Sequence, residues 1–333
     1  MRFTSAAILG SGSFGTAVAK LISPQLDHVL LIGRDADSAR MINEQHRNPQ
    51  YLAGVELPAN VSAGTDVSAA ADHPLVIFVV PTSVMRECAE EIARAGLPDS
   101  AVLISCSKGI EKCSGNRMSQ ILGSVFPNNP VAVLSGPNHA EEIAVGQPAC
   151  AVIGSENPGV ADELQELFTL PHFRAYTSTD LAGIELGGAI KNVYAIAAGM
   201  AHGLGLGDNA VAALVTRALA EMSRLGVALG GRSETFSGLS GVGDLLVTCF
   251  SEHSRNHRVG YALGKGQTME EAVASLGMVA EGVPNTLSIH DAARKAGVRT
   301  PIIDAVHAIL YQNKPTLEAM RELLERDPRP ENS

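Results

Sequence analysis

Short apolar runs alternate with amphipathic stretches over roughly the first half of the chain. Strands are predicted where apolar runs occur, at residues 6–9, 28–32, 75–80, 101–105, 131–134, 149–153 and 173–176. Helices are predicted at 16–22, at 84–95 and through the segment HAEEIA that follows SGPN. Strands that alternate with helices are typical of a parallel doubly wound sheet, whose ligands bind beyond the carboxyl ends of the strands.

The pattern changes near Asp180, after which the strand signal ends. Helices are then predicted at 186–207, 209–229, 255–263, 269–275, 286–296, 302–312 and 316–326. A chain of 333 residues is long enough for two cores. We therefore expect an α/β protein with a Rossmann-type dinucleotide domain at 1–180 and an all-helical substrate domain at 181–333.

The predicted helix at 186–207 is apolar on nearly every side and contains one formal charge, Lys191. Such a helix is expected to be buried. A buried ammonium group loses hydration, which lowers its pKa toward the range useful for proton transfer. The alternative is a lysine whose head group reaches water along an apolar surface. Gly187 and Gly188, one turn earlier, would let another backbone or a ligand approach closely.

A glycine-rich loop, GSGSFG, connects the first predicted strand to the first helix. In this context Gly10 permits a tight turn, Gly12 lets the backbone approach a pyrophosphate, and Gly15 lets the helix pack on the strand. The N-terminus of the helix would then offer free N–H groups and a positive dipole end to the phosphates. The alternative is a glycine turn with a purely structural role.

The second predicted strand ends at Gly33-Arg34-Asp35. NAD sites usually have an acidic residue at this strand end to bind the ribose 2′-hydroxyl. Here Gly33 leaves that place without a carboxylate, and Arg34 could pair with a 2′-phosphate. NADP(H) is therefore favoured, while nearby Asp35 keeps NAD(H) possible. The alternative for Arg34 is an ordinary solvated arginine.

Two more candidate segments follow later strands. Lys108 comes after the strand at 101–105, and Gly136-Pro137-Asn138 comes after the strand at 131–134. The strand rule places both at the same edge of the sheet as the glycine loop and Arg34. A lysine after a strand is also commonly just solvated.

The helical half contains two further motifs. SGVGD, ending at Asp244, is a glycine-rich turn before an apolar helix, and Ser254-Arg255-Asn256 resembles a capped helix start. An arginine, an amide and helix N–H groups together could hold a phosphate. Capping without function is the alternative for Asp244 and Ser254.

A metal site is not expected. Cys249, His253 and His257 are spaced four residues apart, as ligands on one helix would be. Ser251 and Ser254 predict a break in that helix, and the sequence offers no clear fourth ligand nearby.

Composition narrows the classes of partner. The chain has 25 basic and 35 acidic residues, a net charge of −10, which disfavours a general attraction for nucleic acid or anionic membranes. An anionic substrate would then need local basic groups. Five cysteines without a CxxC pair suit a reducing compartment, and no apolar run approaches a membrane span, so we expect a cytoplasmic protein.

Several long motifs in order resemble the bacterial-type NAD(P)-dependent glycerol-3-phosphate dehydrogenase family over essentially the whole chain. The matching stretches are GSGSFGTA, HRNPQYLAGVELPANV, SCSKGIE, LSGPNHAEEIA, IKNVYAIAAGM, SGVGDLLVTC and SRNHRVG. Two departures are small. The family usually has Ser or Thr where Asn138 stands, and often Val-Glu-Gly where this chain has Ala280-Glu281-Gly282.

The resemblance implies reversible hydride transfer between dihydroxyacetone phosphate and sn-glycerol 3-phosphate for glycerophospholipid synthesis, by a homodimer, with Lys191 as general acid and base. Lys108 and Asp244 would hold hydroxyl and carbonyl groups, and Arg255 with Asn256 the phosphate. The implied substrate residues are Lys108, Gly136, Asn138, Lys191, Asn192, Asp244, Thr248, Ser254, Arg255 and Asn256. The implied cofactor residues are Gly10, Gly12, Ser13, Phe14, Gly15, Arg34, Lys108, Ala140, Arg255, Val279 and Glu281.

Two alternatives remain beside this resemblance. One is another hydroxyacid dehydrogenase, of the 6-phosphogluconate or β-hydroxyacid type. These typically have an asparagine four residues after the catalytic lysine, where this chain has Ala195, and here Asn192 follows Lys191 directly. The other is a non-catalytic NADP-binding sensor. The presence of Lys191, Lys108 and Asp244 together disfavours it, because sensing needs no proton donor.

Overall fold

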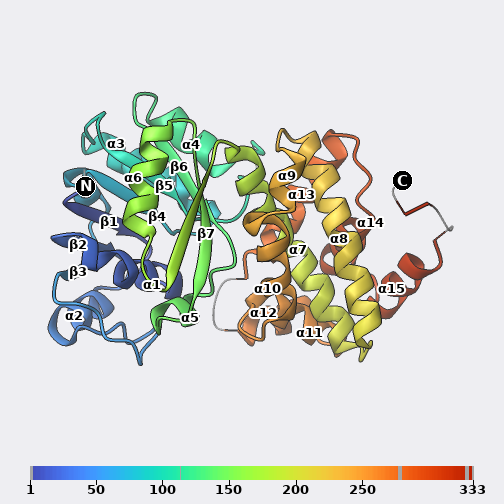
Figure 1. The fold of residues 1–333 in the computed structure, drawn as a ribbon. Coiled ribbons are helices and arrows are strands. Elements are labelled where there is room, and N and C mark those ends of the chain that lie inside the picture. The colour runs from blue at the N-terminus through green and yellow to red at the C-terminus, as the bar shows by residue number, and fades with distance from the viewer. Residues whose placement is uncertain (1–2, 113, 277–279, 327–329, 332–333) are drawn as a thin grey trace.

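The computed structural model describes residues 3–112, 114–276, 280–326 and 330–331. A sheet with helices on both faces forms one half, and a group of helices forms the other (Figure 1). β8 ends at Ser178 and α7 begins at Leu181, so the chain passes from one half to the other over two residues. The predicted combination of a Rossmann-type sheet and a helical C-terminal half is confirmed.

The sheet has eight strands in the order β3-β2-β1-β4-β5-β6-β7-β8. Its strands are β1 (Ser5–Leu9), β2 (His28–Ile32), β3 (Val61–Gly64), β4 (Leu75–Phe78), β5 (Val102–Ser105), β6 (Val131–Ser135), β7 (Ala149–Ser155) and β8 (Phe173–Ser178). β1 lies between β2 and β4, and the first six strands are all parallel. Their carboxyl ends therefore share one edge, which carries the glycine loop, Arg34, Lys108 and Gly136–Asn138 as predicted.

One strand departs from the predicted parallel arrangement, because β7 runs antiparallel to β6. A parallel connection would have to bring the chain back along the length of the sheet. Residues 136–148, all of them described, contain one helix, α5 (Ala140–Ala144). Its five residues rise about 7.5 Å, whereas β6 extends about 16 Å. The chain therefore returns directly beside β6. A full crossover through α6 (Pro158–Phe168) then makes β8 parallel to β7.

Alternating side chains of the strands build a core on each face of the sheet. Ile8, Ile77 and Ile104 pack on the side covered by α1 (Ser13–Ile22), α2 (Ala36–Gln45), α5 and α6. Leu9 and Phe78 pack on the opposite side, against α3 (Met85–Arg94) and α4 (Met118–Val125). The central strands are thus buried on both faces, which explains their nearly continuous apolar sequences.

Helix α7 (Leu181–Gly203) is the centre of the helical half, and nearly all of its residues are buried. It begins five residues before the predicted start because Asp180 caps it by accepting from Gly183 N at 2.9 Å. The other helices are α8 (Asp208–Ala228), α9 (Ser233–Phe236), α10 (Asp244–Phe250), α11 (Arg255–Gly264), α12 (Met269–Ala274), α13 (Gly282–Lys295), α14 (Pro301–Gln312) and α15 (Thr316–Leu324).

Close backbone contact joins α7 to α11. A Cβ atom at Gly199 would lie 2.0 Å from the carbonyl oxygen of His257, and one at Gly260 would lie 2.0 Å from that of Ile196. Glycine is therefore required for this approach of the two helices. The contact sets the start of α11, with Arg255 and Asn256, against the middle of α7.

A buried ion pair joins α7 to the sheet half. Arg117 Nη1 and Ser119 Oγ both donate to the Glu185 carboxylate, and Ser119 N donates to it at 2.7 Å. Ser119 lies in the first turn of α4, so the carboxylate also meets the positive end of that helix. This contact holds α7 against the sheet almost two turns before Lys191.

The apolar pattern did not identify β3 or the helices α2, α4, α6 and α9. Of these, β3 is a four-residue edge strand with one buried position, which gives too little alternation to detect. Within the described residues, no helix is both long and apolar enough to cross a membrane.

Candidate active site

The carboxylate of Asp244 lies between two lysines at the junction of the two halves. Its Oδ1 accepts a hydrogen bond from Lys191 Nζ, and its Oδ2 accepts one from Lys108 Nζ at 2.7 Å. Asp244 is 1% exposed and is the first residue of α10. A buried carboxylate of this kind needs opposite charge around it. The structure thus brings together three predicted residues from three distant parts of the chain.

Lys191 does not extend to water, so the alternative of a snorkelling side chain is excluded. Its side chain is 7% exposed, and Nζ also donates to Thr248 Oγ1 at 2.7 Å. Burial, helped by the positive charge of Lys108 and opposed by the Asp244 carboxylate, lowers the pKa of Lys191 to about 7. An ammonium with this pKa can give and take a proton near neutral pH.

Thr248 is oriented by the backbone of its own helix. Its hydroxyl donates to the carbonyl oxygen of Asp244 at 2.6 Å, one turn earlier. Because that proton is used, Thr248 Oγ1 can only accept from Lys191. Two of the three N–H groups of Lys191 are therefore bound, one by Asp244 and one by Thr248.

Lys108 enters the cluster from the loop after β5. Besides Asp244, its Nζ donates to Asn138 Oδ1 at 3.1 Å and to the carbonyl oxygen of Gly136 at 3.2 Å. These contacts rule out the alternative of a merely solvated lysine. Asn138 is buried, and its amide nitrogen has no hydrogen-bond partner within the described part of the chain.

Gly187 and Gly188 make room for this cluster. A Cβ atom at Gly187 would lie 2.4 Å from the carbonyl oxygen of Ser240, in the π-helical turn that leads into α10. One at Gly188 would lie 2.8 Å from Ser135 Oγ and 3.3 Å from the Lys108 side chain. The close approach predicted for the two glycines is thus made by backbone and by the second lysine.

Asn192 and Asn256 are committed to contacts inside the protein. Asn256 Nδ2 donates to Asn192 Oδ1 at 2.9 Å, and Gly282 N donates to Asn256 Oδ1 at 2.9 Å. Asn192 Nδ2 makes a long contact of 3.5 Å with the carbonyl oxygen of Lys108. These amides therefore brace α7, α11 and α13 against one another beside the lysines.

The N-terminus of α11 faces the same junction. Ser254 caps it as predicted, accepting from His257 N at 3.2 Å, and Arg255 is the exposed first residue of the helix. Glu281 lies near Arg255 and accepts from Thr82 Oγ1 at 3.2 Å. Burial raises the pKa of Glu281, while Thr82 and the charge of Arg255 oppose that shift.

The glycine loop has the geometry of a pyrophosphate site. Gly10 has φ +110° and lies against the carbonyl of Val79, which excludes larger residues. Gly12 precedes α1, and no atom of the described residues lies within 4 Å of a Cβ position there. Gly15 packs on Gly10. Ser13 and Phe14 form the first turn of α1, whose N–H groups a phosphate could meet. The residues present fit a dinucleotide.

Asn48 supports this loop and was missed by the sequence analysis. It is 1% exposed, and its Nδ2 donates to the carbonyl oxygen of Ser11 and to Thr16 Oγ1, both at 2.8 Å. Its Oδ1 accepts from Gln50 N and Tyr51 N at 3.2 Å. The HRNPQ stretch contained this signal, because an asparagine beside a proline favours a turn that its side chain can brace.

Asp35 has a local structural role. It caps α2 by accepting from Ser38 N at 2.5 Å, and this hydrogen bond is the main cause that lowers the pKa of Asp35. Arg34, directly before it, is exposed. Gly33 lies close to Ser11, where a Cβ would be 2.1 Å from the serine oxygen.

Of the remaining predicted residues, Ala140 is the buried first residue of α5, and Val279 lies outside the described residues. The predicted break between Cys249 and His257 is confirmed, since α10 ends at Phe250 and α11 begins at Arg255. Cys249 is buried in α10, whereas His257 contacts His202 Nδ1 at 2.7 Å.

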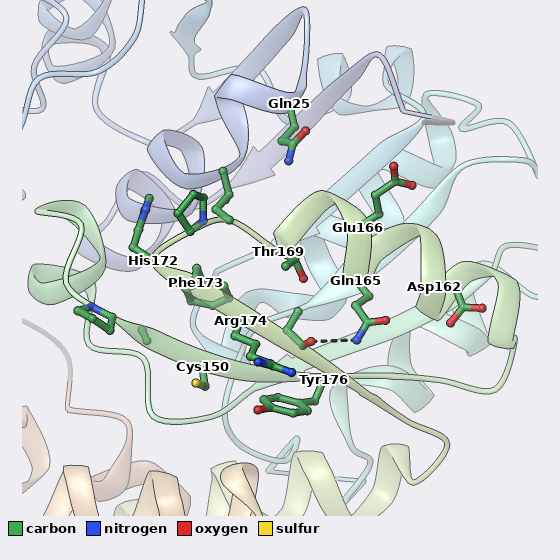
Figure 2. Close-up of a pocket in the computed structure, with 15 residues that line it drawn as sticks. Gln25, Cys150, Asp162, Gln165, Glu166, Thr169, His172, Phe173, Arg174 and Tyr176 are labelled. Carbon is green, nitrogen blue, oxygen red and sulfur yellow. Dashed lines mark hydrogen bonds between the residues drawn. The ribbon is translucent and has the colours of Figure 1, made fainter.

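Figure 2 shows a surface pocket elsewhere in the sheet half, over β8 and α6. Gln165 Nε2 donates there to the carbonyl oxygen of Ala175 at 2.9 Å. Arg174 lies over the ring of Tyr176, 5.2 Å from its centre. The residues that line this pocket, all in the described part of the chain, include none of the predicted site residues.

Sequence comparison identifies the family. The model for the N-terminus of NAD-dependent glycerol-3-phosphate dehydrogenase matches residues 5–161, and the model for its C-terminus matches residues 180–321. A relative from Enterococcus faecalis, named as an NAD(P)+ glycerol-3-phosphate dehydrogenase, is 43% identical over 98% of this chain and 97% of its own. This chain belongs to the NAD-dependent glycerol-3-phosphate dehydrogenase family.

Other members of the glycerol-3-phosphate dehydrogenase family agree. A relative of the same name from Chlorobium phaeobacteroides is 42% identical over 98% of this chain and 99% of its own. The crystal structure of glycerol-3-phosphate dehydrogenase from Coxiella burnetii superposes with a TM-score of 0.93 at 35% identity, covering 97% of this chain and 99% of that one. The match to the two models of this family, over residues 5–161 and 180–321, disfavours the alternative of a 6-phosphogluconate-type enzyme.

Proposed function

We propose that the protein catalyses the reversible NAD(P)H-dependent reduction of dihydroxyacetone phosphate to sn-glycerol 3-phosphate. Family membership and the names of its relatives support the reaction. The observation that carries the proposal is the buried Lys191, whose pKa of about 7 and contact with Asp244 suit a group that protonates an alkoxide.

The nicotinamide, when bound, supplies hydride chemistry. Lys191 delivers a proton to the substrate oxygen that becomes the secondary hydroxyl, and removes it in the reverse reaction. Asp244 and Thr248 hold two N–H groups of Lys191, which leaves one for that oxygen. Because the donor is oriented before the substrate arrives, little reorganisation accompanies the proton transfer.

Lys108 and Asn138 are proposed to bind the substrate's oxygen atoms together with Asp244 and the backbone of Gly136. A substrate oxygen would take the Lys108 N–H that otherwise meets the Gly136 carbonyl at 3.2 Å, the longest of the three contacts of this ammonium. The unpartnered amide nitrogen of buried Asn138 supports this, since a buried donor without a hydrogen bond is unfavourable. Arg255, Ser254 and the N–H groups at the start of α11 are proposed to bind the phosphate. For Asn192 and Asn256 we propose support of these groups through the amide contacts described above.

For the cofactor, we propose that Gly10, Gly12, Ser13, Phe14 and Gly15 hold the pyrophosphate region and that Arg34 contacts the 2′-phosphate of NADPH. The commitment of Asp35 to capping α2 supports an NADP preference, because its carboxylate already accepts a backbone hydrogen bond. The proposed contacts along the rest of the cofactor are Lys108, Ala140, Arg255, Val279 and Glu281.

We further propose a dinucleotide domain at 1–180, a substrate domain at 181–333, and a cytoplasmic homodimer that supplies glycerophospholipid synthesis. The mass of the protein in solution, by light scattering, tests the homodimer.

The decisive experiment mixes purified protein with NADPH and follows absorbance at the nicotinamide band as dihydroxyacetone phosphate is added. Rapid oxidation is expected, with sn-glycerol 3-phosphate as the product. Binding of NADPH without turnover would instead support the sensor alternative. Turnover with a hydroxyacid but not with dihydroxyacetone phosphate would overturn the substrate assignment.

A further inference from the structure

The backbone of Lys108 is held from the helical half by a residue outside the predicted site. Asn285, on the second turn of α13, donates from Nδ2 to the carbonyl oxygen of Lys108 at 2.8 Å. Asn285 is 1% exposed, so this hydrogen bond forms where water cannot replace it. The only other side-chain donor to that oxygen within the described residues is Asn192, at the longer distance of 3.5 Å.

The fit of Asn285 against the Lys108 loop is tight. A Cβ atom at the next residue, Gly109, would lie 2.4 Å from Asn285 Oδ1 and 2.9 Å from its Nδ2. The glycine therefore permits the amide to lie directly over the Lys108–Gly109 peptide. A side chain at position 109 would force the Asn285 amide away from this peptide.

The same end of α13 includes or contacts residues that are proposed to bind the cofactor and to support the phosphate site. Glu281 precedes the helix and accepts from Thr82, and Gly282 N donates to Asn256. A single helix start thus carries contacts to the sheet edge, to α11 and to the Lys108 loop. Movement of α13 would be transmitted to Lys108 through Asn285.

The position of the Lys108 backbone determines where its ammonium lies. All three N–H groups of that ammonium are used, on Asp244, Asn138 and Gly136. A small displacement of the Cα atom would stretch one or more of these contacts. Misplacement of reacting groups by about 1 Å can reduce rates about a hundredfold.

We propose that Asn285 is a positioning residue: it fixes the backbone of Lys108 so that the ammonium meets the substrate and Asp244. The inference rests on the proposed function, in which Lys108 binds the substrate.

The test compares kcat and KM for wild type, Asn285→Ala and Asn285→Asp. Asn285→Asp keeps the size but replaces the donor by oxygen facing a carbonyl oxygen. Both variants should lower kcat/KM for dihydroxyacetone phosphate about tenfold. This loss lies between the small loss expected from one missing hydrogen bond and the roughly hundredfold loss expected from a displacement of about 1 Å. The dissociation constant of NADPH, measured by fluorescence, should change by less than about threefold, because Asn285 bonds to the Lys108 backbone and leaves the glycine loop and Arg34, other proposed cofactor contacts in the sheet half, in place.

Asn129→Ala is a matched control. Asn129 is also buried and donates from Nδ2 to backbone carbonyl oxygens, those of Pro98 at 2.8 Å and Ala101 at 2.9 Å. It lies beside the amino end of β6, away from the lysines. Its loss should lower the thermal midpoint as Asn285→Ala does, while kcat/KM stays within about twofold of wild type.

A double-mutant cycle with Lys108→Met separates positioning from general loss of structure. If Asn285 acts through Lys108, Asn285→Ala should change the residual activity of Lys108→Met by less than about twofold. An equal loss in both backgrounds would overturn the proposal, and so would unchanged kcat/KM in both Asn285 variants. If Asn285→Ala does not fold, Asn285→Asp is compared alone. Wild-type turnover is measured alongside, so its absence would count against the proposed function rather than against Asn285.

Discussion

Lys191 of α7 and Asp244 of α10 form a buried ion pair between residues 53 positions apart in the chain. Each side chain is less than one-tenth exposed, so neither charge is well hydrated. Removing one member of such a pair is usually destabilising because the other is left uncompensated. Here Asp244 retains Lys108 at 2.7 Å when Lys191 is changed, so the site should tolerate a neutral residue.

Lys191→Met should therefore fold and bind NADPH, but lose turnover. Methionine matches the length of the lysine stem and lacks the proton. We expect kcat to fall about a hundredfold or more, the scale of general acid catalysis. Steady-state kinetics and NADPH fluorescence titration measure the two properties separately. Near-normal turnover by this variant would end the assignment of Lys191 as proton donor.

The pKa of Lys191, about 7, predicts opposite pH profiles for the two directions of the reaction. Reduction needs the protonated amine, so kcat/KM should decline as pH rises above about 7. Oxidation needs the neutral amine, so kcat/KM should rise with pH through the same region. Measuring kcat/KM of both reactions from about pH 5.5 to about pH 9, in steps of about half a pH unit, would reveal these opposite trends. Parallel profiles in both directions would contradict the role of Lys191.

Arg255→Lys should weaken phosphate recognition although the positive charge is retained. The guanidinium offers a planar pair of donors that an ammonium cannot reproduce. KM for dihydroxyacetone phosphate should rise about tenfold, whereas activity on unphosphorylated dihydroxyacetone should be poor in wild type and hardly lower in the variant. Equal losses on both compounds would show that Arg255 acts elsewhere, for example on the cofactor.

Arg34→Ala should reduce the preference for NADPH over NADH. A charge-assisted contact contributes about 1.5–3 kcal/mol, which is roughly ten- to hundredfold in affinity. Because Arg34 is exposed, screening by solvent and salt favours the lower end of this affinity range. Added salt should therefore reduce the preference for NADPH over NADH in wild type but hardly in the variant. KM for NADPH should rise with little change for NADH. An equal rise in KM for NADPH and NADH would indicate that Arg34 contacts a part of the cofactor that the two share, such as the adenine.

Glu221 makes stability depend on pH. It is buried on α8, accepts from Ile302 N and Ile303 N at 3.1 Å at the start of α14, and contacts the Tyr194 hydroxyl at 3.4 Å. Burial raises its pKa to about 7. The folded protein therefore holds the proton more strongly than the unfolded chain, so the free energy of unfolding should fall as pH rises from about 4.5 to 7.

Glu221→Gln cannot ionise and should remove this contribution, which is on the order of 3 kcal/mol. Urea unfolding at a series of pH values measures it, with the exposed Glu318→Gln as the control. The wild-type and control curves should share the decline between about pH 4.5 and 7, and the Glu221→Gln curve should be flatter. A decline of the same size in all three proteins would show that other groups cause it.

The sequence by itself determined seven of the eight strands, the main helices of the second half and the edge of the sheet that carries the site. Periodicity of apolar residues is a local property, because it reports which side of a strand or helix is buried. The glycine loop could also be predicted from the sequence, because its backbone conformation depends on the few residues around Gly10 and Gly15. A lone charge in an apolar helix marked Lys191, and the strand order placed Lys108 near the same edge.

Only the tertiary structure decided which of these groups meet. The sequence could not show that Asp244 joins the two lysines, that Asp35 caps α2, or that Asn285 holds the Lys108 loop. Nor could it show the reversed direction of β7, although the short α5 is its cause. The contacts of Asp244 and Asn285 join segments far apart in the chain, and local patterns of polarity contain no information on such partners. Packing of α7 against the sheet half and the other helices brings Lys191 and Lys108 to Asp244, because buried charges are stable only when they are paired.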